Sequence, residues 1–357
     1  MGSMRRRRLW FKCIVVWICL AEVVCLGARV FLSSAESHGE GRTKASAGVS
    51  PAAATPPSQV PRNVVVTCTP ALRNNSDTDS TVNGVVLFLA GKKEPFFLSR
   101  ALPLLEAHFL AHFSYPVHIF HENMSEEWQA AIRGVLPSAR WVSFEDVGRF
   151  WRELPDGVTE EQLAAWMRTP SQRRYQGRGY RIMCRFWAGL VWRLPSLDTY
   201  EYYWRLDTDS YLTSHVPCDV FKLMRVNHCV YGYRRIRGEN PRVVWELWPT
   251  FLRWAKVTLS SAELAGVTEF ALNTSTKDYE GVMYYNNFEL GTMKLKRHPL
   301  YSSIFHFLDT EEPRGIMRYR WGDAPIHTLA VETVMQHEGW KKCQFDQRFA
   351  GYMHGKK

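Results

Sequence analysis

The chain has 357 residues, of which 46% are hydrophobic and 22% charged, and this composition is typical of a globular protein. The formal net charge is +10, and the run from Arg5 to Arg8 supplies four of these charges. A nucleic-acid partner would require a clustered basic stripe, whereas the most basic stretch, 225–242, is interrupted by cysteine, tyrosine and glycine. We therefore exclude nucleic acid as a partner, and the mild positive charge suits a small anionic substrate.

The N-terminus predicts entry into the secretory pathway. Arg5 to Arg8 precede a largely apolar stretch from Leu9 to Leu32, which Glu22 and two basic residues interrupt. Basic residues before an apolar segment stay in the cytosol, and a stretch of this length can span a bilayer once. The alternative is a cleaved signal peptide, with Ser33-Ser34-Ala35 as its cleavage site.

Under either interpretation, a stem and a folded domain follow the apolar stretch. We expect a cytosolic basic tail and membrane anchor at 1–32, a flexible stem at 33–62 and a folded lumenal domain at 63–357. The stem is rich in alanine, serine, glycine, threonine and proline, which cannot build a hydrophobic core. It would hold the folded domain away from the membrane.

Glycosylation sequons and cysteines agree with a lumenal domain. Asn-x-Ser triplets begin at Asn74, Asn123 and Asn273. Five cysteines follow the apolar stretch, so at least one of them lacks a partner within the chain. We expect one or two disulfides, but the sequence alone leaves their connectivity open.

The beginning of the folded domain predicts an α/β architecture of Rossmann type. The continuous apolar run Gly84–Ala90 is typical of a strand. We expect an amphipathic helix at 94–113 and a second strand at Pro116–Phe120. Strand, helix and strand form a parallel unit, and nucleotides bind such sheets at the carboxyl ends of the strands. The sequence contains neither a dinucleotide-binding glycine motif nor a P-loop.

The strongest local signal is an Asp-x-Asp motif. An aromatic, strand-like run from Tyr200 to Leu206 ends in Asp207-Thr208-Asp209. Residues i and i+2 of an extended chain point the same way, so both carboxylates can bind one hard divalent cation. Such a cation would neutralise a nucleotide diphosphate and stabilise it as a leaving group.

Three further segments accompany this motif. They are Tyr180–Trp187 (YRIMCRFW), Tyr284–Gly291 (YYNNFELG) and Arg320–His327 (RWGDAPIH). Together with the Asp-x-Asp run, they resemble glycosyltransferase family 15, the fungal-type Golgi α-1,2-mannosyltransferases, over about 85–352. The resemblance implies a GT-A-like, Rossmann-type nucleotide-sugar-binding domain whose mixed sheet is flanked by helices. It also implies a single-pass type II protein of the Golgi membrane with a lumenal catalytic domain.

The resemblance also implies roles for individual residues. The family usually has Glu-Pro-Asp at the Asp-x-Asp position, so Asp207 and Asp209 keep the carboxylates of a metal site. By resemblance, His327 completes that site, and this mixed ligand set is compatible with Mn²⁺ or another divalent cation. Glu289 resembles the catalytic residue proposed to lie beneath the anomeric carbon of the sugar, and a salt-bridge carboxylate is the alternative.

Four further residues are substrate-binding candidates: Tyr180, Arg185, Asn287 and Asp323. Tyr180 and Arg185 could contact the donor or the acceptor, or have a purely structural role. Asp323 could bind a sugar hydroxyl, or form a helix cap or turn. The sequence departs from the usual family pattern at 91–94, where an arginine-asparagine sequence is expected, and at the C-terminal 345–357.

The implied reaction transfers mannose from GDP-mannose to an oligosaccharide or glycoprotein acceptor. Because GDP-mannose and an α-1,2 product are both α-linked, the reaction would retain configuration. Retaining glycosidases use two carboxylates, but a metal-bound diphosphate leaves without protonation, so Glu289 alone could suffice as nucleophile or charge stabiliser. The alternatives are an inactive relative that binds glycans or nucleotide sugars, a transferase with another donor or linkage, and a metal-dependent hydrolase.

Overall fold

The computed structural model describes residues 63–69, 72, 82–91, 94–169, 177–346 and 349–355. They belong to one unit that runs from Gln59 to Lys357. The expected anchor and stem lie outside the described residues. Within the described ranges, no helix is long and apolar enough to cross a bilayer.

Strands and helices alternate along much of the unit. The strands are β1 (Asn63–Val66), β2 (Gly84–Ala90), β3 (Val117–His121), β4 (Val142–Asp146), β5 (Tyr202–Leu206), β6 (Ser210–Leu212), β7 (Cys229–Tyr233), β8 (Ile236–Gly238), β9 (Val282–Tyr284), β10 (Phe288–Thr292), β11 (Lys341–Phe345) and β12 (Tyr352–His354). The α-helices are α1 (Leu102–Leu105), α2 (Glu126–Val135), α3 (Arg149–Arg152), α4 (Glu160–Arg168), α5 (Arg178–Arg185), α6 (Val220–Val226), α7 (Leu247–Thr258), α8 (Ser261–Ala271), α9 (Met293–Lys296), α10 (Pro299–Thr310), α11 (Gly315–Arg318) and α12 (Asp323–Glu338).

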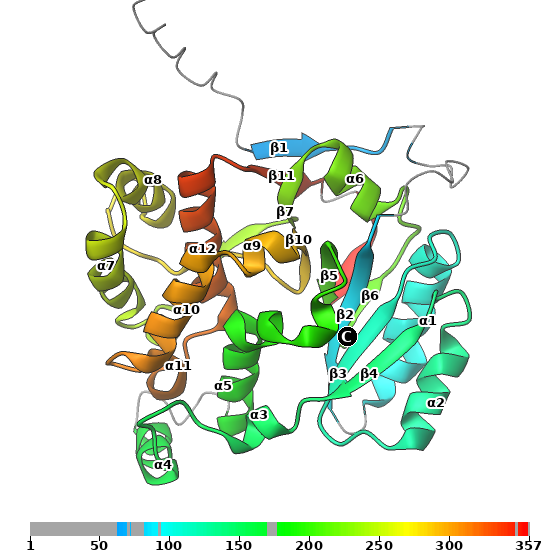
Figure 1. Cartoon of the computed structure of the whole chain (residues 1–357), viewed down its shortest axis with the longest axis horizontal. Helices are drawn as coiled ribbons and strands as arrows, with labels where there is room; N and C mark the ends of the chain where they lie inside the picture. The colour runs from blue at the N-terminus through cyan, green and yellow to red at the C-terminus, as the bar shows by residue number, and fades with distance from the viewer. Residues whose placement is uncertain are drawn as a thin grey trace, which may run out of the picture. The chain divides into compact units, whose positions relative to one another are not determined.

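A mixed sheet runs through the unit (Figure 1). Its eight strands within the described residues lie in the order β1-β11-β7-β10-β5-β2-β3-β4. β2 is parallel to both β5 and β3, and β3 is parallel to β4. In contrast, β10 is antiparallel to both β5 and β7. The carboxyl ends of β5, β2, β3 and β4 therefore lie at the same edge of the sheet.

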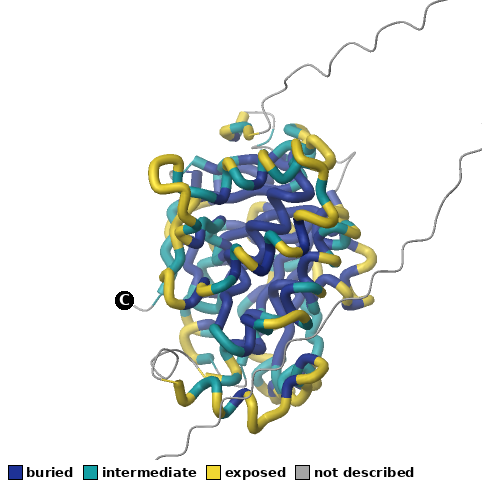
Figure 2. The backbone as a smooth tube through the Cα atoms, turned by 90° about the vertical axis from the view of Figure 1, so that its left-hand side faces the viewer, coloured by how far each residue is buried: buried dark blue, intermediate teal, exposed yellow. Residues whose placement is uncertain are grey.

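The strand β2 is apolar throughout because helices cover both faces of the sheet. Val85 and Leu87 belong to a buried cluster with side chains of α5, α7, α8, α10 and α12, whereas Val86 and Phe88 pack with α1, α2 and α6. Figure 1 shows α7, α8, α10 and α12 grouped on the side away from α1 and α2. Figure 2 shows the buried backbone in the interior and the exposed segments around it. Alternate residues of a strand face opposite ways, so a strand that is buried on both faces has a continuous apolar run.

The expected α/β fold is confirmed, with differences in detail. β2 has the expected bounds, β3 begins one residue later than expected, and β5 covers the last five residues of the aromatic run. The helix expected at 94–113 is present, but π-helical segments, Phe97–Ala101 and Glu106–Leu110, flank α1. Buried residues at 97, 101, 105 and 109 keep the spacing of four that a helical apolar face requires.

Two disulfides link segments that are distant in sequence. Cys68 is bonded to Cys218, and Cys229 is bonded to Cys343, which joins β7 to β11. The thiol of Cys184 is buried and free. This arrangement confirms the expectation of one or two disulfides with an unpaired cysteine left over.

Candidate active site

The Asp-x-Asp motif forms a tight turn at the carboxyl end of β5. The backbone N–H of Ser210 donates to the carbonyl of Asp207, and the Ser210 hydroxyl accepts from the N–H of Asp207 at 3.2 Å. β6 begins at Ser210 and pairs with β12, whose register places His354 opposite Ser210. β12 therefore brings His354 to the motif.

Asp207, Asp209 and His354 form a group that could hold a metal ion. Their possible ligand atoms all lie within 4.8 Å of one another. His354 Nε2 is 3.0 Å from Asp209 Oδ1 and 3.6 Å from Asp207 Oδ2. Two carboxylates and one imidazole suit a divalent cation such as Mn²⁺.

Neighbouring polar groups orient these three side chains. Tyr285 places its hydroxyl 2.9 Å from His354 Nδ1, which leaves Nε2 facing the carboxylates. The Asn287 amide donates to Asp207 and lies 2.6 Å from His354 Nε2. Burial lowers the pKa of His354, but hydrogen bonds to Asp207 and Asp209 outweigh it and raise the pKa to about 9. Burial raises the pKa of Asp207, but Arg205 and His354 hold it below its usual value.

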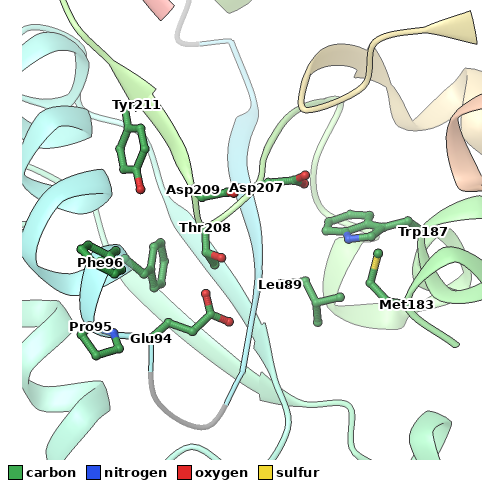
Figure 3. Close-up of a pocket in the computed structure, with 11 residues that line it drawn as sticks. Leu89, Glu94, Pro95, Phe96, Met183, Trp187, Asp207, Thr208, Asp209 and Tyr211 are labelled. Carbon is green, nitrogen blue, oxygen red and sulfur yellow. The ribbon is translucent and has the colours of Figure 1, made fainter. Parts of the chain in front are cut away.

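A cavity of about 490 Å³ opens beside the motif (Figure 3). Its walls come from the end of β2 and the segment after it, from α5 and the π-helical segment Phe186–Leu190 that follows it, and from the β5–β6 connection with β6. The lining residues are Leu89, Glu94, Pro95, Phe96, Phe97, Met183, Trp187, Asp207, Thr208, Asp209 and Tyr211. Figure 3 shows the two aspartates between the Phe96 wall and the Trp187 wall. A largely apolar cavity with a few converging polar groups is typical of a ligand site, and this one has the volume for a nucleotide.

Arg205 connects the motif to Asp323. Its guanidinium lies 2.6 Å from Asp323 Oδ2 and 3.3 Å from Asp207 Oδ1, and it packs 4.2 Å from the ring centre of Trp187. Asn286 donates to the same oxygen of Asp323 at 2.8 Å. Asp323 is the first residue of α12 and is buried, so the structure places it in an ion pair next to the site.

Glu289 lies on β10 opposite Arg205, but it does not line the cavity. Its side chain is 1% exposed. One carboxylate oxygen, Oε1, pairs with Lys296 Nζ at 2.9 Å and accepts a hydrogen bond from the Tyr203 hydroxyl. Lys296 and Tyr203 thus hold the carboxylate in the interior, next to the cavity but not on its surface.

The structure places His327 outside the group of possible metal ligands, which consists of Asp207, Asp209 and His354 among the described residues. His327 lies inside α12 with its side chain 1% exposed, and its ring nitrogens face the Tyr231 hydroxyl, the Tyr301 hydroxyl and Lys296 Nζ. Burial first, and then Lys296 and Arg205, lower the pKa of His327 well below its usual value. An imidazole that already faces an ammonium group is a poor ligand for a second cation.

Arg185 and Tyr180, two of the expected substrate-binding residues, contact other side chains away from the cavity lining. Arg185 Nε pairs with Asp309 at 2.8 Å, which ties α5 to α10, and neither residue lines the cavity. The guanidinium of Arg185 thus binds a buried carboxylate, which corresponds to the structural role that the sequence left open as the alternative. The half-buried Tyr180 stacks against Arg320, whose guanidinium lies 4.4 Å from the ring centre, and it too is outside the cavity lining.

His354 is the residue that the sequence did not reveal. It belongs to a terminal Tyr-Met-His-Gly segment with no metal-binding spacing of its own. The Ser210 and Tyr352 hydroxyls lie 2.8 Å apart across the β6–β12 ribbon, although 142 positions separate them in sequence. The residues around His354 therefore offered no local signal for a metal ligand.

Comparison with known proteins identifies the family. The model of glycosyltransferase family 15, described as glycolipid 2-alpha-mannosyltransferase, matches residues 45–356. The chain belongs to this family. Among family-15 relatives in Saccharomyces cerevisiae, it is 35% identical over 156 residues to the probable mannosyltransferase KTR3, covering 44% of this chain and 38% of that protein. It is 29% identical over 256 residues to the glycolipid 2-alpha-mannosyltransferase, covering 68% of this chain and 55% of that protein. The chain thus spans about two fifths to just over half of the lengths of these relatives.

Solved structures of the family show the same fold. The Mn/GDP form of core-mannan synthase A (CmsA/Ktr4) from Aspergillus fumigatus is 24% identical, with a TM-score of 0.66, covering 79% of this chain and 77% of that chain. The mannosyltransferase Ktr4p from S. cerevisiae is 23% identical, with a TM-score of 0.69, covering 82% of this chain and 75% of that chain. The predicted GT-A-like architecture, with a mixed sheet flanked by helices, is therefore confirmed.

Proposed function

We propose that this family-15 chain is a metal-dependent, retaining mannosyltransferase that moves mannose from GDP-mannose to a mannose-containing glycan in an α-1,2 linkage. The observation that carries the proposal is the cluster of Asp207, Asp209 and His354 beside a 490 Å³ cavity at the carboxyl ends of parallel strands. The names of the relatives support the mannosyl group and the α-1,2 linkage. The Mn/GDP form of the Aspergillus relative supports the donor and the cation.

Each residue of the site has a separate proposed role. Asp207, Asp209 and His354 would hold a divalent cation such as Mn²⁺, which when bound stabilises a diphosphate leaving group. Arg205 and Asn287 fix the Asp207 carboxylate, which limits its movement. Phe96 and Trp187 would supply apolar walls for the donor to pack against. Glu289 is the candidate carboxylate for the positive charge that develops on the sugar.

We also propose that the chain is a type II Golgi membrane protein, with the anchor, stem and lumenal domain at the bounds given above. The basic and apolar N-terminal segments support this location. The two disulfides support it independently, because disulfides persist in the secretory pathway and are rare in the cytosol.

A transfer assay with the full chain, purified in detergent, tests the proposed activity. The chain is offered GDP-mannose or a UDP-sugar, a mannoside acceptor and Mn²⁺, beside an Asp209→Ala variant. We expect product from GDP-mannose that disappears with EDTA and in the variant. Metal-dependent GDP binding without transfer to any mannoside would instead favour a binding-only relative.

A further inference from the structure

A buried charged cluster, separate from the metal-ligand group, surrounds Glu289. Lys296, the last residue of α9, is 2% exposed and pairs with Oε1 of Glu289 at 2.9 Å. The Tyr203 hydroxyl donates to the same oxygen. The other oxygen, Oε2, is buried and has no hydrogen-bond partner among the described residues. The carboxylate therefore has one oxygen with two donors and one oxygen with none.

The strand pairing explains how Tyr203 reaches this carboxylate. Glu289 and Gly291 are two positions apart on β10, so they face the same side of the sheet, and Gly291 lies opposite Tyr203 of β5. A Cβ atom on Gly291 would lie 2.6 Å from the Tyr203 hydroxyl oxygen. The missing side chain leaves room for the tyrosine ring to cross β10 and bind Glu289.

Lys296 is held from several directions. Its ammonium lies 3.2 Å from the Tyr301 hydroxyl, next to His327 Nδ1, and 4.6 Å from the ring centre of Trp192. An ammonium group can only donate hydrogen bonds, so Nδ1 of His327 accepts, and the Nε2–H donates to the Tyr231 hydroxyl at 2.9 Å. His327 is therefore neutral, and Lys296 is the cation that directly balances the buried charge of Glu289.

We propose that Lys296 is a positioning residue for the sugar transfer: its ion pair with Oε1 fixes the Glu289 carboxylate next to the site and leaves Oε2 without a partner among the described residues. This inference rests on the proposed function. A buried carboxylate without a partner would take up a proton or move toward water. A preorganised charge, by contrast, needs no reorganisation when positive charge develops on the sugar.

Kinetics of four variants of the full chain test this role. Lys296→Met removes the ammonium, Glu289→Gln removes the carboxylate charge, and a third variant combines both changes. Lys294→Met is the matched control, because Lys294 is an exposed lysine of the same helix that stacks on Trp340. The measured quantities are kcat, KM for GDP-mannose and the affinity for GDP with Mn²⁺.

We expect Lys296→Met to lower kcat by roughly 100-fold, with KM and GDP affinity within about twofold of the wild type. Glu289→Gln should lower kcat at least as much, and the double variant should be no more active than Glu289→Gln. Lys294→Met should match the wild type. If Lys296→Met does not fold, Lys296→Gln takes its place. We expect Lys296→Gln to lower kcat by less than Lys296→Met would, again without a change in KM.

Two results would overturn the inference. Unchanged kcat on loss of the ammonium would show that Lys296 does not position Glu289. Recovery of activity in the double variant, relative to Glu289→Gln, would show that the two charges only balance each other within the fold. A wild-type chain that binds GDP but transfers no mannose would contradict the proposed function itself, and with it this inference.

Discussion

At the scale of single residues, two histidines in the same domain have opposite surroundings. His354 faces the carboxylates of Asp207 and Asp209, which raise its pKa to about 9. His327 faces Lys296 and tyrosine hydroxyls, and its pKa is lowered well below the usual value. Carboxylates attract a cation to the first imidazole, whereas an ammonium repels one from the second.

These surroundings predict which histidine binds the metal. We expect His354→Ala to weaken Mn²⁺ binding by about 10- to 100-fold, because one of three ligands is lost. His327→Gln should lower the melting temperature but leave Mn²⁺ affinity unchanged. Isothermal titration calorimetry with Mn²⁺ measures both variants, and equal losses in the two would refute the assignment of His354.

The sequence identified some of these residues and not others for a physical reason. Asp207 and Asp209 are neighbours on one strand end, so their convergence follows from local geometry alone. The ligand His354 reaches them only through pairing of β12 with β6, which depends on long-range contacts. The resemblance implies that His327 is a metal ligand, but α12 places that histidine in the interior.

At the scale of elements, buried ion pairs and helix caps hold the helices around the site. Arg185 of α5 pairs with Asp309 of α10, and both side chains are at most 12% exposed. α5 contains Met183 of the cavity wall and leads to Trp187 of the same wall. The pair therefore supports the wall without touching the ligand.

This role predicts a stability effect that is separate from substrate binding. Arg185→Met should lower the free energy of unfolding by about 3–5 kcal/mol, because it leaves Asp309 buried without a partner, while KM for GDP-mannose stays unchanged. Arg178→Met is the control: Arg178 pairs with an exposed Glu160, so its loss should cost less than about 1 kcal/mol. Denaturant unfolding and donor kinetics measure the two effects, and a raised KM with normal stability in Arg185→Met would restore a substrate role.

The start of α8 predicts a dependence of stability on pH. Ser260 and Glu263 form a capping box, and Glu263 also lies 2.6 Å from His337 Nδ1. The hydrogen bond from Ser260, followed by that from His337, lowers the pKa of Glu263 to about 2. Because this value is below the unfolded pKa of roughly 4.3, the stabilisation is present above that pH and is lost as the pH falls toward 2.

Glu263→Ala tests this linkage. We expect the variant to lose about 1 kcal/mol of stability at pH 7, and the difference from the wild type to shrink between pH 5 and pH 3. Thermal unfolding across this range measures the difference. A gap that stays constant or widens on acidification would show that Glu263 does not stabilise α8 through its charge.

At the scale of the whole molecule, one disulfide fastens two neighbouring strands of the sheet, β7 and β11. The bond between Cys229 and Cys343 closes a loop of 114 positions and joins adjacent strands β7 and β11. Such cross-links commonly add about 2–4 kcal/mol by restricting the unfolded chain. We expect a Cys229→Ala/Cys343→Ala variant to unfold at a lower temperature, and Cys184→Ala to keep the sensitivity of the wild type to reducing agent. If reduction left the melting temperature of the wild-type chain unchanged, the Cys229–Cys343 disulfide would not stabilise the fold.

The fold could be predicted further than the site. β2 is an apolar run, and β3 and β5 are rich in aliphatic and aromatic residues and buried on both faces, so pattern alone located all three. The antiparallel insertion of β10 and the order of eight strands depend on which distant strands pair, and no local pattern encodes that choice. Glu289 pairs with Lys296 and Tyr203. For the same reason, these partners could not be predicted from the residues next to Glu289 in the sequence.

The most direct test of the central claim is to follow one reaction mixture by proton NMR. The wild-type chain is incubated with GDP-mannose, a methyl α-mannoside and Mn²⁺, and GDP release and disaccharide formation are recorded together. We predict one α-1,2-linked disaccharide for each GDP released, and neither product with EDTA or Asp209→Ala. GDP release with free mannose and no disaccharide would contradict transferase activity, because it would identify the chain as a hydrolase of the nucleotide sugar.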